Sequence, residues 1–142
     1  MIASEQVRIL LVEDDEVDVM AVKRAFRKLN IDNPLTVACD GIEALQILRG
    51  EDDAKRLSRP LIIILDWNMP RMNGAEFLQA LRSDSELRNI VVFVMTTSSD
   101  ERDRLAAYEQ NVSGYIVKSN DESEFTDIIA MLQEFWCRVQ LP

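Results

Sequence analysis

Short aliphatic segments recur along the chain, and the strongest are apolar at consecutive positions. Four of them lie at residues 7–12, 61–65, 90–95 and 114–118, and a weaker one lies at 35–39. They are rich in Val and Ile and do not alternate with polar residues, which is typical of strands buried on both faces of a parallel sheet. The pattern therefore predicts five strands.

Helical periodicity fills the intervals between these segments. Apolar residues recur three and four positions apart, which places them on one face of a helix. The most regular stretch is the last, with apolar residues at Phe125, Ile128, Ile129, Leu132, Phe135, Trp136 and Val139. Strands and helices thus alternate five times. This predicts a single α/β domain over residues 1–142, with a parallel sheet and helices on both faces.

Local signals predict some of the element boundaries. Ser98 and Glu101 stand at the spacing of a capping box, which places the start of the fourth helix at Ser98. Gly50 is expected to end the second helix. Residues 51–60 are expected to form a charged surface loop.

Charge and hydropathy exclude several classes of partner. The chain has 142 residues and a net charge of −9, which argues against binding to nucleic acid. No apolar run is long enough to span a bilayer, and the N-terminus lacks the pattern of a secretory signal. We therefore expect a cytoplasmic protein without a membrane partner. Cys39 and Cys137 lie far apart and are expected to be reduced residues of the core or of an interface.

The chain has no histidine. This excludes a Ser-His or Cys-His nucleophilic pair and a His-ligated zinc site. Any reactive site must use carboxylates, hydroxyls, amides, Lys or Arg. Oxygen ligands of this kind favour Mg²⁺, Ca²⁺ or Mn²⁺.

Polar residues follow the predicted strands at the points where binding sites form in open parallel sheets. Glu13 and Asp14 follow the first strand, Asp66 follows the third, Thr96 follows the fourth and Lys118 ends the fifth. Because the carboxyl ends of parallel strands meet at one edge, we expect these side chains to converge.

Convergence of Asp14 and Asp66 needs a source of positive charge. Two like charges about 4 Å apart repel by roughly 4 kcal/mol at an effective dielectric near 20. A divalent cation would remove this repulsion, and Mg²⁺ commonly combines one or two carboxylates with a phosphoryl oxygen. Lys118 is expected to pair with Asp66 or with a phosphate on it. A carboxylate can itself act as a nucleophile and form an aspartyl phosphate.

These residues lie in four motifs that resemble the receiver domain of two-component response regulators. The motifs are LLVEDD at 10–15, LDWNMPRMNG at 65–74, VMTTS at 94–98 and GYIVKS at 114–119. Their order and spacing cover essentially the whole chain. The resemblance implies a flavodoxin-like (βα)5 fold with strand order 2-1-3-4-5, and a switch that a sensor histidine kinase phosphorylates in the presence of Mg²⁺.

The resemblance also implies a metal site and a phosphoacceptor. Asp66 matches the phosphoacceptor and a metal ligand. Asp14 matches the direct Mg²⁺ ligand, and Glu13 matches the acid that acts through metal-bound water. Asn68 matches the residue whose backbone carbonyl completes the metal site.

Other matching residues belong to the switch. Thr96 matches the hydroxyl residue that turns toward the phosphoryl group, Tyr115 matches the aromatic switch residue, and Lys118 matches the phosphate-pairing lysine. Pro70 and Gly74 match the loop that shapes the backbone after the phosphoacceptor. The resemblance also implies that the switch acts on a downstream protein.

Two positions depart from the pattern or qualify it. The family commonly has Pro directly after the lysine, often with a cis peptide bond, whereas this chain has Ser119. Trp67 is a bulky residue directly after Asp66, where it could affect access to the site.

A finer resemblance is to stand-alone regulators partnered with bacterial phytochrome kinases, which dimerise through the fifth helix and the tail. For this chain it implies a homodimerisation element at about 121–142. Phe135, Trp136 and Val139 are its candidate interface residues, unless these side chains fold back onto their own domain.

Two other functions stay open at this point. A metal-dependent phosphatase or phosphotransferase for a small substrate would use the same carboxylates. Such enzymes usually place a second Asp two residues after the nucleophile, where this chain has Asn68. A binding module of receiver fold that works without phosphorylation would not need the full set of acids, Thr96 and Lys118.

Overall fold

The computed structural model describes residues 6–51, 57–119 and 121–142. Within these residues five strands and five helices alternate along the chain. Their bounds are β1 Arg8–Val12, α1 Glu16–Lys28, β2 Leu35–Ala38, α2 Gly41–Arg49, β3 Leu61–Leu65, α3 Gly74–Ser83, β4 Val91–Thr96, α4 Glu101–Glu109, β5 Gly114–Val117 and α5 Glu122–Arg138. The predicted alternation is confirmed. Residues 52–56 of the charged loop predicted at 51–60 lie outside the described residues.

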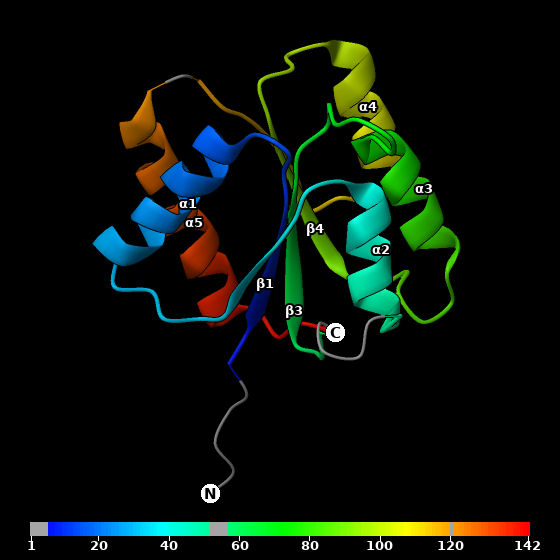
Figure 1. Ribbon diagram of the computed structural model, residues 1–142, viewed down its shortest axis with the longest axis horizontal. Coiled ribbons are helices and arrows are strands. Elements are labelled where there is room, and N and C mark those ends of the chain that lie inside the picture. The colour runs from blue at the N-terminus through cyan, green and yellow to red at the C-terminus, as the bar shows by residue number, and fades with distance from the viewer. Residues whose placement is uncertain (1–5, 52–56, 120) are drawn as a thin grey trace, which may run out of the picture.

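The strands form one parallel sheet in the order β2-β1-β3-β4-β5. This is the predicted order. All five strands run in the same direction, so their carboxyl ends lie along the upper edge of the sheet in Figure 1. The polar residues that follow the strands are therefore brought to this edge.

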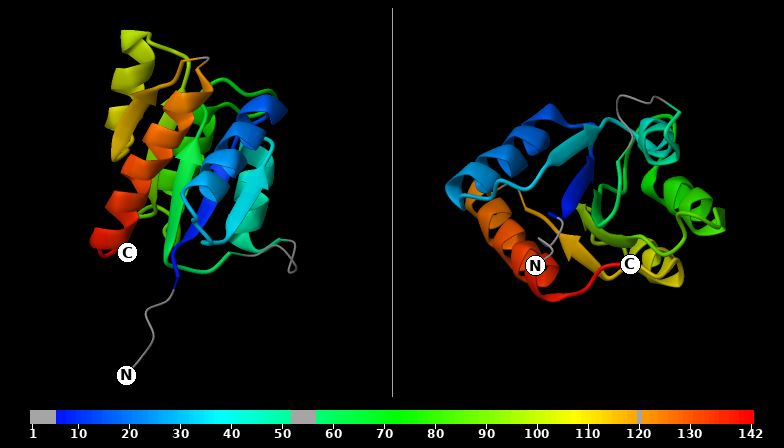
Figure 2. Two further views of the ribbon diagram at one scale, coloured as in Figure 1. Left: turned by 90° about the vertical axis from the view of Figure 1, so that its left-hand side faces the viewer. Right: turned by 90° about the horizontal axis from the view of Figure 1, so that it is seen from below.

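Helices cover both faces of the sheet. Helices α1 and α5 lie on one face, and α2, α3 and α4 lie on the other, as Figures 1 and 2 show. Successive residues of the central strands point to opposite faces. In β3, Ile62 and Ile64 pack with α1 and α5, while Ile63 and Leu65 pack on the other face. Burial on both faces explains the unbroken apolar runs in the sequence.

Each helix begins at an Asp or Asn whose side-chain oxygen accepts a hydrogen bond from a backbone N–H of the first turn. These residues are Asp15, Asp40, Asn73, Asp100 and Asp121. Gly50 ends α2 in the left-handed conformation, with φ of 70°, as predicted.

The prediction that the fourth helix starts at Ser98 is wrong. Helix α4 begins at Glu101 and is capped by Asp100. The Ser98 hydroxyl instead donates to Asp103 Oδ2 over 2.6 Å, and the Ser98 carbonyl accepts a hydrogen bond from the Tyr115 hydroxyl over 2.9 Å. These contacts hold Ser98 in the loop between β4 and α4.

The aromatic residues near the C-terminus, Phe135 and Trp136, pack against the core of their own domain. Trp136 is 4% exposed and its ring lies 6.1 Å from that of Phe26. Phe135 is partly buried, with its ring at a steep angle to that of Phe93. The expectation of an exposed aromatic surface is therefore wrong for Trp136, which folds back onto its own domain. Val139 is 44% exposed.

Both cysteines are free, as expected, and both are exposed, so neither Cys39 nor Cys137 belongs to the core. In the part of the chain that the structure describes, no helix has the length and apolar character needed to cross a membrane.

Gly74 allows α3 to start directly against the end of β3. Its N–H donates to the Trp67 carbonyl over 2.9 Å. A Cβ at this position would lie 2.9 Å from the Asp66 carbonyl oxygen. This confirms that Gly74 shapes the backbone after Asp66, because a side chain here would push α3 away from that residue.

Candidate functional site

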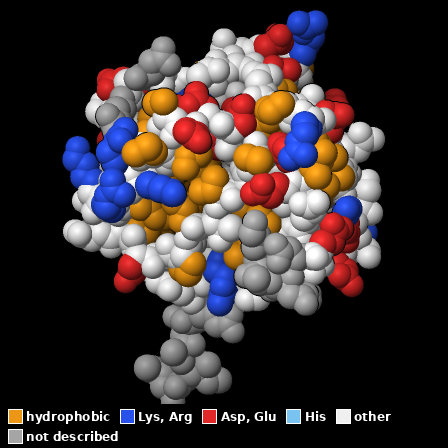
Figure 3. All heavy atoms as spheres, in the orientation of Figure 1, with side chains coloured by type: hydrophobic (Ala, Val, Ile, Leu, Met, Phe, Trp, Pro, Cys, Tyr) orange, Lys and Arg blue, Asp and Glu red, His pale blue; other side chains and the backbone are white. Residues whose placement is uncertain are grey.

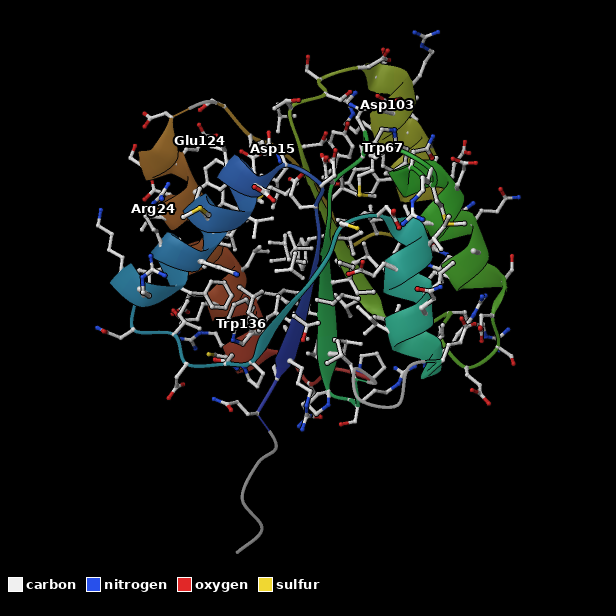
Figure 4. The ribbon with its side chains drawn as sticks, in the orientation of Figure 1. Asp15, Arg24, Trp67, Asp103, Glu124 and Trp136 are labelled. Carbon is white, nitrogen blue, oxygen red and sulfur yellow. The ribbon has the colours of Figure 1, made fainter. Side chains whose placement is uncertain are left out.

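Backbone hydrogen bonds extend the sheet by one residue beyond β1 and β3, and so place two carboxylates side by side. The Glu13 N–H donates to the Ala38 carbonyl over 2.9 Å, and the Asp66 N–H donates to the Val12 carbonyl over 2.9 Å. Both residues thus belong to the rigid sheet rather than to a loose loop. Figure 4 shows Asp15 and Trp67, which follow these two residues closely in the sequence, in the upper part of the molecule on either side of the central strands.

Three carboxylates converge there. One carboxylate oxygen each from Glu13, Asp14 and Asp66 lies within 4.8 Å of the others. Glu13 is 3% exposed and Asp66 is 8% exposed, whereas Asp14 is open to solvent. Hard oxygen donors at this separation fit a divalent cation. The predicted convergence of Asp14 and Asp66 is confirmed.

Asn68 and Thr97 lie at the mouth of the same pocket. Both residues are exposed. The pocket is lined by Glu13, Asp14, Asp15, Asp18, Asp66, Asn68, Thr97 and Lys118. Both residues therefore belong to the solvent-exposed part of the pocket that contains Asp66.

Lys118 reaches the pocket from the far side of the sheet. Its backbone N–H donates to the Thr96 carbonyl over 2.8 Å, which fixes the residue beside β4. Its buried Nζ lies 2.6 Å from Glu13 Oε1, 2.8 Å from Asp18 Oδ2 and 4.0 Å from Asp66 Oδ1. The expected pairing with Asp66 is therefore the longest of three contacts.

Sequence reasoning missed Asp18. The only signal was an acid in the first turn of a helix that starts at the site, and such acids are usually explained by the helix dipole. What the sequence does not show is that this side chain points toward Lys118, because that depends on how α1 packs beside α5.

Burial dominates the electrostatics of the site. It raises the pKa of Glu13 to about 8, although the hydrogen bond and charge of Lys118 act in the opposite direction. It also raises the pKa of Asp66, again against the charge of Lys118. For Lys118, burial acts to lower the pKa, but hydrogen bonds to Asp18 and Glu13 outweigh it and raise the pKa. One ammonium group therefore does not neutralise the acids around it.

Thr96 and Tyr115 connect the pocket to the loop that precedes α4. Thr96 is fully buried, and its hydroxyl oxygen accepts a hydrogen bond from the Ser98 N–H over 3.3 Å. The Tyr115 hydroxyl donates to the Ser98 carbonyl over 2.9 Å. The Tyr115 ring also meets Trp67 edge-on, with 6.4 Å between ring centroids. A change beside Asp66 would reach Ser98 through both residues.

A second set of contacts holds the loop after Asp66. Arg71 has a left-handed backbone, with φ of 61°, and its Nε donates to Asp40 Oδ2 over 2.6 Å. The Gly41 N–H donates to the Met72 carbonyl over 3.3 Å. The loop is thereby tied to the start of α2.

The peptide bond between Lys118 and Ser119 is not cis, unlike the Lys-Pro bond common in the family.

The family model described as "Response regulator receiver domain" matches residues 9–130. The chain belongs to this family. One relative is the response regulator Rcp1 of Synechocystis sp., which is 34% identical over 135 residues that cover 94% of this chain and 92% of Rcp1.

Solved structures agree with this assignment. The phosphorylated cyanobacterial phytochrome response regulator RcpA has a TM-score of 0.88 and 34% identity, over 98% of this receiver chain and 99% of RcpA. The Mn²⁺-bound form of Rcp1 has a TM-score of 0.85 and 34% identity, over 97% and 99% of the two chains. The predicted resemblance to receivers of phytochrome-associated regulators is confirmed. The roles of individual residues stay predictions.

Glu13 should make the stability of the metal-free receiver depend on pH. Its pKa is about 8 in the folded protein, against an ordinary value of 4.5. Between these values the folded state holds a proton that the unfolded state has released. We expect the free energy of unfolding, measured with urea in the presence of EDTA, to fall as the pH rises from about 5 to about 8. Glu13→Gln should reduce the slope, because it removes this titrating group.

The control is Glu16→Gln, which removes an exposed acid from the first turn of α1. It should leave the slope unchanged. A free energy of unfolding that rises with pH over this range, or a slope that Glu13→Gln does not change, would contradict the prediction.

Proposed function

We propose that this protein is a phosphorylation-controlled signalling switch in which Asp66 accepts a phosphoryl group from a sensor histidine kinase. The proposal rests on the position of the Asp66 carboxylate. It is grouped with the carboxylates of Glu13 and Asp14, and its Oδ1 lies 4.0 Å from Lys118 Nζ. During transfer, an Asp66 oxygen bonds to phosphorus as the phosphorus–nitrogen bond of the donor breaks, and the electron pair of that bond stays on the imidazole. The donor histidine belongs to another protein, since this chain has none.

We propose Mg²⁺ as the cation, with Mn²⁺ or Ca²⁺ as substitutes. The side chains of Glu13, Asp14 and Asp66 and the backbone carbonyl of Asn68 would hold it. When bound, it supplies positive charge to the carboxylates and to the phosphoryl oxygens. The Mn²⁺-bound form of Rcp1 supports a divalent cation in a receiver of this kind.

The switch itself follows from three side chains. Lys118 would move from its acidic partners toward the phosphoryl oxygens. The Thr96 hydroxyl would turn toward them, leaving the Ser98 N–H. Tyr115 already contacts the same loop through the Ser98 carbonyl, so it would adjust with it. A covalent group shifts such an equilibrium only by the contacts that differ between the two states.

An exposed apolar face is available for a downstream protein. It is formed by α4, β5 and α5, and its exposed apolar residues are Leu105, Tyr108, Val117 and Met131. The face adjoins the loop that Thr96 and Tyr115 contact. We propose that it changes its binding preference on phosphorylation.

The alternative function of a metal-dependent phosphatase is less well supported, because Asn68 stands where such enzymes place an acid.

Phosphorylation by a small donor tests the central proposal. After incubation with acetyl phosphate and Mg²⁺, intact-protein mass spectrometry should show one added phosphoryl group on the wild-type protein. Asp66→Asn should show none, because the amide lacks the nucleophilic oxygen, and EDTA should prevent labelling of the wild type. Equal labelling of wild type and Asp66→Asn, or no labelling of either, would overturn the proposal.

The kinase is proposed to dock beside α1. Val17 and Met20 are 71% and 54% exposed on this helix, and Met20 lines an apolar groove that reaches Glu13 and Asp14. Figure 3 shows apolar side chains on this face, next to the basic side chains of α1. The similarity to the cyanobacterial phytochrome regulator RcpA supports a bacterial phytochrome as the kinase.

A charge in this groove should slow transfer from the kinase and not from acetyl phosphate. We expect Met20→Asp to lower the initial rate of transfer from a phosphorylated phytochrome kinase by roughly tenfold, the effect of losing a well-placed apolar contact. Leu105→Asp is the matched control, since Leu105 is 53% exposed on α4. Equal rates for Met20→Asp and wild type would contradict docking at α1. Failure of every phytochrome kinase tested would contradict the choice of kinase.

We also propose that the protein is a single receiver domain that forms a homodimer through α5 and the tail, within residues 121–142. Trp136 serves the core of its own domain, so we assign the interface to partly buried Phe135 and to exposed Met131 and Val139. Met131→Asp should shift the mass measured by sedimentation toward that of the monomer, because it places a charge in an apolar contact. Met20→Asp is the control. A wild type that sediments as a monomer, with and without phosphorylation, would contradict the dimer.

A further inference from the structure

Asp18 makes the second of the two short contacts to Lys118. Its Oδ2 lies 2.8 Å from Lys118 Nζ, and the Asp18 side chain is 23% exposed. Asp18 also lines the pocket that contains Asp14 and Asp66. Neither the metal site nor phosphoryl transfer to Asp66 requires a fourth carboxylate at this place.

The position of Asp18 in its helix does not explain the contact. An acid in the first turn of α1 is stabilised by the helix dipole, but Glu16 provides an acid in the same turn. Asp18 instead connects α1 to the residue that follows β5. The contact therefore spans two elements that are far apart in the sequence and meet at the edge of the pocket.

Lys118 cannot satisfy every acid near it. Its Nζ is within hydrogen-bond distance of Glu13 and Asp18, and it is 4.0 Å from Asp66 Oδ1. To pair with a phosphoryl group on Asp66, the ammonium must move away from at least one of the nearer acids. Each contact that is present only before this movement favours the unphosphorylated state.

Glu13 and Asp18 differ in the contacts that remain to their negative charge after the Lys118 ammonium moves toward Asp66. Glu13 also accepts a hydrogen bond from the Asp15 N–H over 3.2 Å, and it is one of the three acids grouped for a cation. Among the described residues, Asp18 has an ion pair only with Lys118. Loss of Lys118 is therefore offset by other protein contacts at Glu13, whereas Asp18 is left with only partial exposure to water and the N-terminus of α1.

We propose that Asp18 is a positioning residue that holds Lys118 back from Asp66 and so sets how strongly the phosphorylated state is favoured. This inference rests on the proposed phosphorylation of Asp66. It assigns to Asp18 a restraint on the switch, separate from the binding of metal and from the transfer step.

The test uses the beryllium trifluoride anion, a non-covalent mimic of a phosphoryl group, in the presence of Mg²⁺. Its dissociation constant is measured by titration calorimetry for the wild type and three variants. Asp18→Asn should bind the anion roughly twofold to fivefold more tightly, the range that a partly exposed ion pair supports. Asp18→Glu keeps the charge and should stay near the wild-type value. Glu16→Gln removes the same charge from the same helical turn and should leave the value unchanged.

A second readout follows Lys118 itself. In spectra of protein with ¹³C-labelled lysine, the Lys118 Cε signal should move when beryllium trifluoride binds. In Asp18→Asn without the anion, this signal should already be displaced toward the bound position. An Asp18 that only stabilised α1 would not move it. Urea unfolding of each variant confirms that the comparison is between folded proteins.

Two results separate this inference from the proposed function. If wild type binds the anion and Asp18→Asn binds it with equal or weaker affinity, the restraint by Asp18 is wrong while the function stands. A wild type that neither binds beryllium trifluoride nor accepts phosphate from acetyl phosphate would overturn the function and the inference together. If Glu16→Gln also binds beryllium trifluoride more tightly than the wild type, the effect of Asp18→Asn is a general effect of charge, and the inference is overturned.

Discussion

The structure depends on one unbalanced electrostatic cluster, in which a single buried ammonium group faces several carboxylates. Lys118 has two short contacts, to Glu13 and Asp18, and a longer one to Asp66. The acids are held there by the sheet, because Glu13 and Asp66 continue the backbone ladders of β1 and β3. They cannot move apart without breaking those ladders. The chain therefore keeps a site that is short of positive charge, and this shortage is what favours a divalent cation.

The parallel sheet is what makes such a cluster possible from distant parts of the sequence. Glu13, Asp66 and Lys118 follow β1, β3 and β5, and Thr96 ends β4. These strands are far apart in the sequence, but the order β2-β1-β3-β4-β5 makes the four of them consecutive neighbours in the sheet. Aliphatic burial on both faces provides the rigidity. The apolar core therefore fixes the positions of the charged side chains at the carboxyl edge of the sheet. The helices on each face connect this edge to the rest of the surface.

Much of the fold and part of the site could be predicted because their causes are local in the sequence. Strands buried on both faces are unbroken apolar runs, and strand ends in a parallel sheet converge, so the meeting of Asp14 and Asp66 followed from order alone. Trp136 could not be placed, because its burial depends on Phe26 across the α1–α5 contact. The start of α4 could not be placed either, because Tyr115 and Asp103 hold Ser98 in the preceding loop. Asp18 was missed for the same reason, since its partner comes from the far end of the chain.

The same long-range contacts explain how a local charge could alter a distant surface. Trp67 directly follows Asp66 and meets Tyr115 edge-on, and Tyr115 bonds to Ser98. Thr96 is buried next to the same loop and also bonds to Ser98. Two routes from the pocket thus end on one backbone segment, which leads into α4. Helix α4 has one fully buried residue, Ala107, and it exposes Leu105 and Tyr108. A helix with so small a buried face is held weakly by the core, so a shift at Ser98 changes its position more easily than that of any helix anchored by a full apolar stripe.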